Sequence, residues 1–358
     1  MLASDLATLA RVLRDDIAPR TASTSVVIAD HPHARLIRYG SDQQLNAARE
    51  SGAVPVLLVP PLAVPARCYD LAPGVTPGNS VVEFLLSTGT VVYVVDFGDV
   101  TRAERHLGFE DYFDTFVPRA IGEAIDDFAS GGDAVDLMAW SLGGTVSLMT
   151  AAHDKSLPIR SVITVGTPLN YMLLPPYPLV RTLLAPTGGR PATYVLRAMA
   201  GIPAPIVRTV YRGFAWEREL KKPWYILKNL DDPEALARMQ VIDRFQRSLP
   251  GYPGKVAQQM LVNFIVRDEL SRGRLEFDDT VVDLTSITAP IFMVGSHRDA
   301  IASHAAVRHG EQIFTESAHV EFHTVESSHL GLLTGAAAAE QTWPAIAAFR
   351  ARLDAERL

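Results

Sequence analysis

Five short, nearly unbroken apolar runs limit what this chain of 358 residues can fold into. The runs are VPVLLVP (54–60), TVVYVVDF (90–97), AVDLMAW (134–140), RSVITVG (160–166) and APIFMVG (289–295). Strands that are apolar on both faces are typical of a parallel sheet covered by helices on both sides. Stretches with helical spacing lie between them, at about 79–88, 109–129 and 142–154, which gives βαβ units with right-handed crossovers. We therefore predict an α/β fold with a mostly parallel sheet flanked by helices.

The alternation of strands and helices stops between residues 168 and 280. Proline-rich segments such as PPYPL and SLPGYPG separate helix-like stretches there, for example 231–248. The alternation returns with the run at 289, continues with a last strand at 319–325 and closes with a helix at 340–356. We predict that 1–167 and 281–358 form one core and that 168–280 is a mainly helical lid inserted into it.

The N-terminal part precedes the first buried strand. The runs at 25–30 and 34–40 predict an antiparallel hairpin at the sheet edge. Residues 1–16 combine apolar residues at helical spacing with the charges of Asp5, Arg11, Arg14, Asp15 and Asp16, which favours an amphipathic helix over a signal peptide. Nowhere do about 18 apolar residues run without charge, so no membrane span is predicted. We expect a cytoplasmic protein whose amphipathic surface could still contact a lipid or granule surface.

Charge and cysteine content exclude several classes of protein. The 33 Lys and Arg and 40 Asp and Glu are spread along the chain and leave a net charge of −7, so no basic block is present to bind nucleic acid. Cys68 is the only cysteine, which excludes a disulfide framework and a thiolate zinc site, and we expect it to be a small buried hydrophobe. No P-loop or GxGxxG motif follows a strand, and His297 and His304 lack a ligand set, so we predict no cofactor and no metal. The sequence leaves a homodimer open.

A nucleophile motif follows the third apolar run. The segment A-W-S-L-G places Ser141 between the strand at 134–140 and the helix at 142–154. This order is close to the G-x-S-x-G turn of the α/β-hydrolase fold, in which small residues flank a sharply turned serine because larger side chains would collide with strand and helix. Ala139 stands at the first small position. We predict that Ser141 is the catalytic nucleophile; the alternative is a serine that caps the helix.

A serine nucleophile needs a base, and the base needs an acid that orients it. Asp299 follows the run at 289–295 in the loop GSHRDAI, and His329 follows the last strand in the turn ESSHLG. Both positions lie at the carboxyl edge of the sheet, where this fold places its acid and base. We predict a Ser141, Asp299 and His329 triad. The alternatives for the acid are Asp96 and Asp99, and those for the base are His297, His304, His309, His319 and His323.

The oxyanion that forms during acyl transfer needs two hydrogen-bond donors. One is the amide after the nucleophile, here that of Leu142. The other should come from the loop after the first apolar run, where Pro60 and Pro61 have no N–H, so Leu62 is the first residue able to donate. His106 and Asp111 match an H-x4-D pattern found in some acyltransferases, but this spacing is so common that we interpret it as a chance match.

Longer stretches of the chain carry a family resemblance. PVLLVPPLAVPARCYDLAP resembles a strand-plus-PP segment, NSVVEFLLSTGTVVYVVDF a helix with the strand after it, VVDLTSITAPIFMVGSHRDAI an acid loop, and SSHLGLLTG a histidine turn. Together they are similar to the polyhydroxyalkanoate synthase family, or PhaC type, of α/β-hydrolase-fold acyltransferases. The resemblance covers most of the chain from about residue 54 onward. It implies the same triad of Ser141, Asp299 and His329.

Two positions depart from the pattern of that family. Its polymerising members have cysteine as the nucleophile and tryptophan soon after the acid, whereas this chain has Ser141 and Ala302-Ser303. A serine ester holds an acyl group more stably than a thioester does and releases it mainly to water or an alcohol. We therefore predict a serine-dependent acyl hydrolase or acyltransferase that acts on acyl esters or acyl-CoA thioesters.

The predicted lid supplies the candidate substrate contacts. Its aromatic residues Tyr171, Trp216 and Trp224 would form part of an apolar cover over the cleft. Two other functions remain open at this point. One is a polymerising, polyester-synthase-like acyltransferase, and the other is a non-catalytic scaffold on a lipid or granule surface.

Overall fold

The computed structural model describes residues 2–74, 79–128, 134–214 and 216–356. Eight of the described strands form one sheet in the order β1-β2-β4-β3-β5-β6-β11-β12. They are β1 (Ser25–Ala29), β2 (Arg35–Tyr39), β3 (Val56–Val59), β4 (Val92–Asp96), β5 (Val135–Trp140), β6 (Ile159–Val165), β11 (Ile291–Gly295) and β12 (Val320–Thr324). The pairings β1–β2 and β2–β4 are antiparallel, and all pairings from β4 to β12 are parallel. The mostly parallel sheet and the hairpin at its edge are therefore confirmed.

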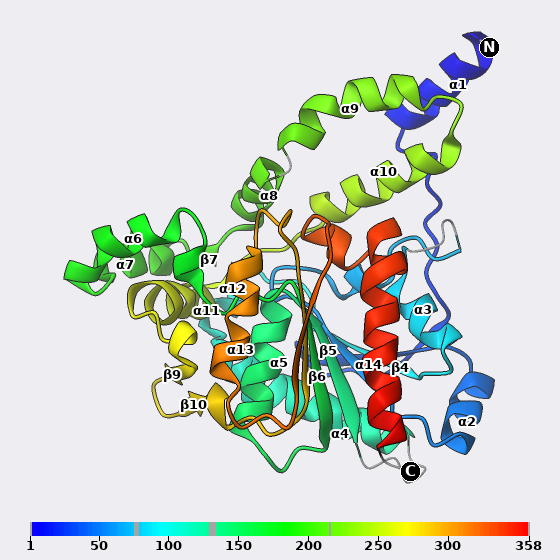
Figure 1. Ribbon diagram of the computed structural model, residues 1–358. Coiled ribbons are helices and arrows are strands. Elements are labelled where there is room, and N and C mark those ends of the chain that lie inside the picture. The colour runs from blue at the N-terminus through cyan, green and yellow to red at the C-terminus, as the bar shows by residue number, and fades with distance from the viewer. Residues whose placement is uncertain (1, 75–78, 129–133, 215, 357–358) are drawn as a thin grey trace.

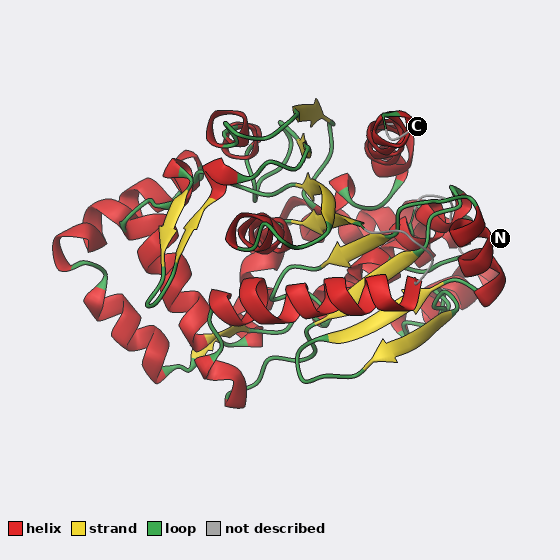
Figure 2. Ribbon diagram, turned by 90° about the horizontal axis from the view of Figure 1, so that it is seen from below, coloured by secondary structure: helices red, strands yellow, loops and turns green. Residues whose placement is uncertain are grey.

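Helices cover both faces of this sheet (Figure 1 and Figure 2). The core helices are α2 (Asp42–Glu50), α3 (Val81–Ser87), α4 (Val117–Phe128), α5 (Leu142–His153), α12 (His304–Arg308), α13 (Gly310–Ile313) and α14 (Trp343–Ala355). Neighbouring residues of one strand divide between the two layers: Leu57 packs in the cluster with α4 and α5, and Leu58 in the cluster with α3 and α14. Burial on both faces explains why the strands are apolar without alternation.

The helix predicted over 109–129 differs from an ideal one. Its first part, Asp111–Phe116, is π-helical, and α4 continues from it. The π-helical part buries Tyr112, Phe113 and Phe116. The sequence predicted the helix but not the wider turn, because an apolar spacing near 3.6 residues does not distinguish the two.

The amino end of β5 carries a buried ionic cluster. Asp136 is fully buried and accepts hydrogen bonds from Arg160 Nε at 2.8 Å, Arg350 Nε at 2.8 Å and Ser161 Oγ at 2.7 Å. Arg350 of α14 also donates to Thr90 Oγ1 and to the carbonyl of Val54, both at 2.7 Å. Burial alone would raise the pKa of Asp136, but the hydrogen bonds and charges of the two arginines hold that pKa below its usual value. The cluster therefore ties α14 to this end of the sheet.

The segment between β6 and β11 contains most of the remaining helices. They are α6 (Tyr177–Leu184), α7 (Arg190–Ala198), α8 (Ala204–Phe214), α9 (Trp216–Lys228), α10 (Pro233–Arg247) and α11 (Gly254–Gln259), with two short antiparallel pairs, β7 (Gly201–Ile202) with β8 (Tyr252–Pro253) and β9 (Arg274–Glu276) with β10 (Val281–Asp283). The helix predicted at 231–248 is confirmed as α10. The division of the chain into core and lid stays a prediction.

An arm formed by α9 and α10 extends from the top of the molecule, and α1 (Leu2–Leu13) lies near its end (Figure 1). The chain after α1 is held on α10, where Gln240 Oε1 accepts from the amides of Ile17 at 2.9 Å and Ala18 at 3.0 Å. Arg244 of the same helix pairs with Asp15 at 3.0 Å. Within the described residues, none of the helices has the length and apolar character needed to cross a membrane.

Candidate active site

The turn between β5 and α5 holds Ser141 in a conformation that residues other than glycine rarely adopt. Its backbone angles are φ 51° and ψ −126°. Ser141 N donates to Val165 O at 2.8 Å, and Ser141 O accepts from Gly144 N and Thr167 Oγ1, each at 2.9 Å. Strained backbone of this kind persists only where the surroundings fix it, and it is concentrated at functional sites. The strand-to-helix turn that the motif predicted is thus present.

Two glycines after Ser141 let α5 lie directly against its neighbours. A Cβ on Gly143 would lie 2.3 Å from Val59 O, and a Cβ on Gly144 would lie 2.0 Å from Thr167 Oγ1. Neither position can carry a side chain unless the surroundings shift. Ala139, at the first small position of the motif, is fully buried in β5, so the structure accommodates this alanine.

Asp299 and His329 form a buried hydrogen-bonded pair. Asp299 lies in the loop after β11 and His329 in the turn after β12, and His329 Nδ1 is 2.6 Å from Asp299 Oδ2. The other carboxylate oxygen, Oδ1, accepts from the amides of Ile301 at 2.8 Å and Ala302 at 2.9 Å. These bonds fix the carboxylate, and an ionised carboxylate keeps the imidazole proton on Nδ1. Nε2 is then the basic nitrogen.

The basic nitrogen of His329 is buried and unpaired. In the described part of the chain, Nε2 has no hydrogen-bond partner, so Ser141 does not bond to it in this structure. The imidazole ring lies beside Trp140, with 5.1 Å between ring centroids, and Trp140 directly precedes Ser141. A Cβ on Gly166, just after β6, would lie 3.1 Å from the ring. Nucleophile and base thus lie at the same sheet edge, and hydrogen bonds between such groups often tighten only when substrate binds.

The alternative acids and bases have other contacts. Asp96 Oδ1 accepts from Gly98 N at 3.0 Å, and Asp99 lines a surface cavity with Asp96. Each competing histidine has its own neighbour: His297 and His304 stack with ring centroids 3.8 Å apart, His309 Nε2 is 2.8 Å from Ser271 O, His319 Nε2 is 3.4 Å from Glu321 Oε2, and His323 lies 6.3 Å from the Phe292 ring. These contacts favour His329 as the base.

Two other residues that the sequence singled out do not join this site. His106 Nδ1 bonds to Ala103 O at 3.0 Å, and Asp111 Oδ2 accepts from Gly108 N at 2.7 Å, so the two do not pair with each other. Cys68 is fully buried, as predicted, and burial raises the pKa of its thiol well above the usual value. Among the described residues, no cluster of three His, Cys, Asp or Glu side chains could hold a metal ion. The absence of a cofactor stays a prediction.

The candidate oxyanion donors lie at the same sheet edge as Ser141. Strands β3 and β5 are parallel neighbours, so the loops that follow them leave the sheet at the same edge. Leu142 opens α5 directly after Ser141. Leu62 is buried, with 2% of its surface exposed, in the loop after β3. Their roles as donors stay predictions.

Tyr69, which sequence reasoning missed, joins these two loops. Its hydroxyl donates to Val59 O at 2.7 Å and accepts from Trp140 N at 3.0 Å. Asp136 N donates directly to Pro55 O at the other end of the same strand pair. Four residues further along each strand, the equivalent hydrogen bond would run from Trp140 N to Val59 O. The hydroxyl of Tyr69 lies between these two atoms and bonds to both.

The inserted phenol replaces the last direct bond between β3 and β5 beside the nucleophile. Tyr69 is fully buried, and burial raises the pKa of its hydroxyl well above the usual value, so the proton is retained. Tyr69 therefore sets how far the loop after β3 lies from the Ser141 turn. The sequence around Tyr69 does not indicate which carbonyl its hydroxyl reaches.

A cavity of about 690 Å³ opens at the imidazole of His329. Apolar side chains form much of its lining, including Trp140, Phe214, Trp216, Ile242 and Phe245. Arg218, Lys221 and Arg298 also line it. Trp216 therefore reaches the cavity, and its contact with substrate stays a prediction. Tyr171 packs instead against Phe264, and Trp224 is 72% exposed; neither lines this cavity. Their substrate contacts stay predictions.

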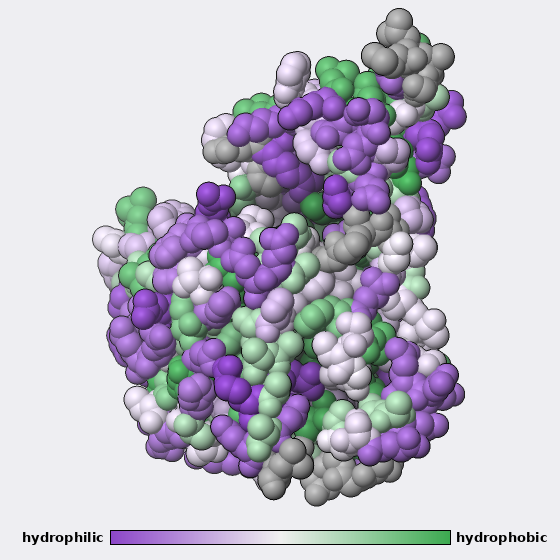
Figure 3. Space-filling view, turned by 45° about the vertical axis from the view of Figure 1, so that its right-hand side comes forward, coloured by the Kyte–Doolittle hydropathy of each residue, from purple (hydrophilic) through white to green (hydrophobic). Residues whose placement is uncertain are grey.

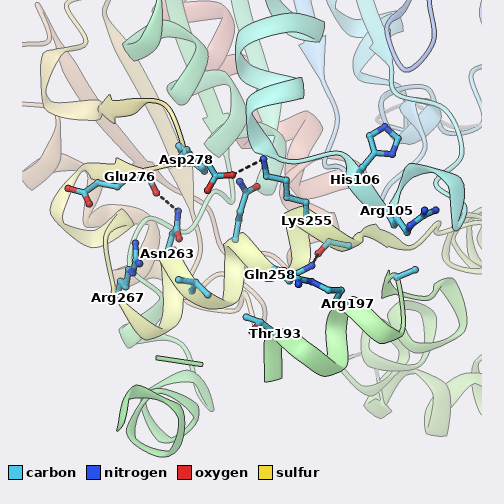
Figure 4. Close-up of a pocket in the computed structure, with 15 residues that line it drawn as sticks. Arg105, His106, Thr193, Arg197, Lys255, Gln258, Asn263, Arg267, Glu276 and Asp278 are labelled. Carbon is cyan, nitrogen blue, oxygen red and sulfur yellow. Dashed lines mark hydrogen bonds and ion pairs between the residues drawn. The ribbon is translucent and has the colours of Figure 1, made fainter. Parts of the chain in front are cut away.

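A second cavity, of about 670 Å³, lies between α7, α11 and β9 and contains none of the triad residues (Figure 4). Its lining is polar and charged. An ion pair of Lys255 and Asp278 crosses it at 3.3 Å, and Asn263 Nδ2 donates to Glu276 O at 3.0 Å. His106 and Thr193 line this cavity, but Ser141, Asp299 and His329 do not, so we assign no acyl chemistry to it.

Comparisons with known proteins identify the family of this chain. The sequence model described as "Alpha/beta hydrolase family" matches residues 56–341. A poly(3-hydroxyalkanoate) polymerase subunit PhaC from Allochromatium vinosum is 24% identical over 87% of this chain and 84% of its own length. A protein of the same name from Haloarcula marismortui is 24% identical over 83% of this chain and 61% of its own length. The predicted resemblance to the PhaC type is confirmed.

Among solved structures, the 2-hydroxy-6-oxo-6-phenylhexa-2,4-dienoate hydrolase BphD from Rhodococcus sp. strain RHA1 aligns with a TM-score of 0.49 at 13% identity. The alignment covers 92% of this chain and 99% of that one.

Proposed function

This chain belongs to the alpha/beta hydrolase family and is an enzyme of that class, and we propose that it transfers acyl groups from esters or thioesters through an acyl intermediate on Ser141. The observation that carries the proposal is the buried Asp299–His329 pair, whose Nε2 is unpaired among the described residues. The His329 ring lies 5.1 Å from that of Trp140, the residue before the strained Ser141. A buried nitrogen without a partner is costly unless another group uses it. A serine proton and a substrate are the groups that fit.

The chemistry follows from the placement of each group. Ser141 Oγ attacks the acyl carbon while His329 Nε2 takes its proton, and the resulting imidazolium is stabilised by Asp299. The amides of Leu142 and Leu62 donate to the oxyanion. As the intermediate collapses, the leaving alcohol or thiol takes the proton from Nε2. Water or an alcohol then attacks the acyl-serine and, with His329 again as the base, releases an acid or a new ester.

The apolar cavity supports an acyl chain as the part of the substrate that is buried. Phe214 of α8, Trp216 of α9 and two residues of α10, Ile242 and Phe245, line the same cavity as His329. We propose that 168–280 acts as the lid over this cavity, because three of its helices, α8, α9 and α10, supply these apolar side chains. Substrate contacts by Tyr171 and Trp224 would require this lid to move.

Polymerisation is the second candidate, and the relatives favour it. Those relatives are named as polymerase subunits and align over most of this chain. Against it stands Ser141, because a serine ester is a poorer donor of an acyl group to a growing chain than a thioester. A hydrolase or a transferase to a single alcohol is therefore the better-supported function.

The test compares wild type with Ser141→Ala. Intact-protein mass spectrometry and product analysis would follow mixing with short, medium and long acyl-CoA and glycerol esters. We expect wild type to gain an acyl adduct or release product, and Ser141→Ala to lose activity by at least about 1,000-fold. Ser87→Ala, at an exposed serine on α3 whose hydroxyl donates to Phe84 O, is the control and should retain full activity. Equal turnover by wild type and Ser141→Ala would reject the proposal.

A further inference from the structure

The expectation that charge is spread along the chain does not hold for one segment. Residues 177–229 contain nine Lys and Arg and two Asp and Glu, a net charge of +7, whereas the whole chain has a net charge of −7. This segment forms α6 to α9. Arg181, Arg218 and Lys222 are paired with Asp268 or Asp243. Four others are exposed and form no salt bridge among the described residues: Arg190, Arg197, Arg212 and Lys228.

The helix α9 exposes its apolar face and turns its charged face toward the protein. Its exposed side chains include Trp216 (59%), Leu220 (72%), Trp224 (72%) and Leu227 (56%), which share one helix face. Its opposite face carries Arg218 and Lys222, which pair with Asp243 of α10. Amphipathic surface helices normally bury the apolar face and expose the charged one. The inversion indicates that something apolar covers the outer face.

The apolar face continues onto the preceding helix. Ile206, Val210 and Phe214 of α8 follow one another at four-residue steps and are 43%, 50% and 46% exposed. Figure 3 shows hydrophobic side chains along the upper edge of the arm, above a belt of hydrophilic ones. Single exposed apolar residues are normal, but a contiguous stripe over two helices marks an interaction site. We call these seven residues of α8 and α9 the lid face.

The lid face is continuous with the mouth of the catalytic cavity. Phe214 and Trp216 belong to both, since each lines the cavity that opens at His329. Whatever covers the lid face therefore lies next to the entrance that an acyl group would use.

The basic charge of residues 177–229 distinguishes between two molecules that could cover the lid face, a second copy of this chain and a lipid bilayer. A second copy of this chain, related by a twofold axis, would place the basic segment against itself, and like charges across an interface are unfavourable. The surface of a phospholipid bilayer containing anionic lipid fits both properties: Trp and Leu enter the boundary of the acyl chains, and Lys and Arg contact the phosphates. We propose that the lid face docks on such a bilayer surface. The docking itself does not depend on the proposed acyl chemistry.

Vesicle sedimentation of the full chain tests this. We expect strong binding to vesicles of phosphatidylcholine with an equal share of phosphatidylglycerol, weak binding to phosphatidylcholine alone, and loss of binding as salt rises. Leu220→Glu with Trp224→Glu should weaken binding at least about 10-fold, because two exposed apolar anchors become anionic. Lys228→Gln, four residues after Trp224 and so beside the lid face, should weaken binding to the anionic vesicles about 5-fold and leave binding to neutral vesicles unchanged.

Two controls separate this proposal from others. Val281→Glu changes an exposed valine on β10, outside the lid face, and should bind as wild type does. Ser141→Ala should also bind as wild type does, so a failure of the proposed chemistry would leave the docking result intact. Absence of binding to anionic vesicles, or equal binding to neutral ones, would overturn the proposal. So would a wild-type dimer in light scattering that Leu220→Glu with Trp224→Glu converts to a monomer.

Discussion

The two ends of strand β5 are both buried but are built in opposite ways. At the amino end, Asp136 is paired with two arginines and a serine, and Arg350 in turn bonds to Thr90 and Val54. At the carboxyl end, Ser141 has a strained backbone and the nearby His329 Nε2 has no partner among the described residues. One end satisfies its polar groups completely, and the other leaves strain and an unused base.

We infer that the amino end of β5 contributes to stability and that the carboxyl end is arranged for reaction at a cost in stability. None of the residues of the ionic cluster lines the cavity at His329. Substitutions in the cluster should therefore change the stability of the fold and not the rate of the reaction. The strained turn costs free energy that the rest of the fold must offset.

Arg350→Met should strongly destabilise the fold. It removes one partner of the buried Asp136 and leaves that carboxylate with an uncompensated part of its charge. We expect a loss of about 3–5 kcal/mol in the free energy of unfolding, measured by urea denaturation. Arg352→Met, which removes an arginine of the same helix whose side chain is 51% exposed, should cost less than about 1 kcal/mol. Turnover per folded molecule should not change in either variant. A lower turnover would mean that the ionic cluster also affects the active site.

Tyr69→Phe should affect both stability and rate. Removal of the hydroxyl leaves Val59 O and Trp140 N without their partner, which costs about 1–3 kcal/mol of stability. Because the same bonds set the spacing of the oxyanion loops, we also expect kcat to fall about 10–100-fold with KM little changed.

The matched control for that variant is Tyr93→Phe. Tyr93 is equally buried, and its hydroxyl donates to Asp127 Oδ2 at 2.7 Å on the side of the sheet packed by α4. It should lose similar stability and keep the wild-type kcat. If both variants lost kcat equally, Tyr69 would have a structural role only.

Ser141→Gly should abolish activity yet stabilise the fold. Glycine adopts a positive φ without strain, so relief of the strained turn outweighs the greater entropy of the unfolded chain, with a net gain of about 1 kcal/mol. Thermal unfolding would measure the gain. Ser141→Ala is the comparison, because it also lacks the hydroxyl but keeps the Cβ, and it should gain less. Equal stability of the two variants would mean that the turn is not strained.

Much of the fold could be predicted because burial leaves a mark on the sequence. The apolar runs at 54–60 and 134–140 predicted β3 and β5, since strands buried on both faces have no polar side chains. The prediction of Asp299 and His329 depended on their positions after β11 and β12. In the structure, His329 Nδ1 lies 2.6 Å from Asp299 Oδ2. Contacts between distant segments could not be predicted in this way: the phenol of Tyr69 between β3 and β5 leaves no pattern along the chain.

Neighbouring residues along the chain are enough to predict the order of strands and helices and the sharp serine turn, and they give residues 177–229 their basic character. Only the tertiary structure decided which way α9 turns its apolar face, which groups surround Asp136, and that His329 Nε2 is buried without a partner. The physical reason is that periodicity reports how a segment is divided into two faces. Which face meets the protein and which meets the solvent depends on contacts with segments far away in the chain.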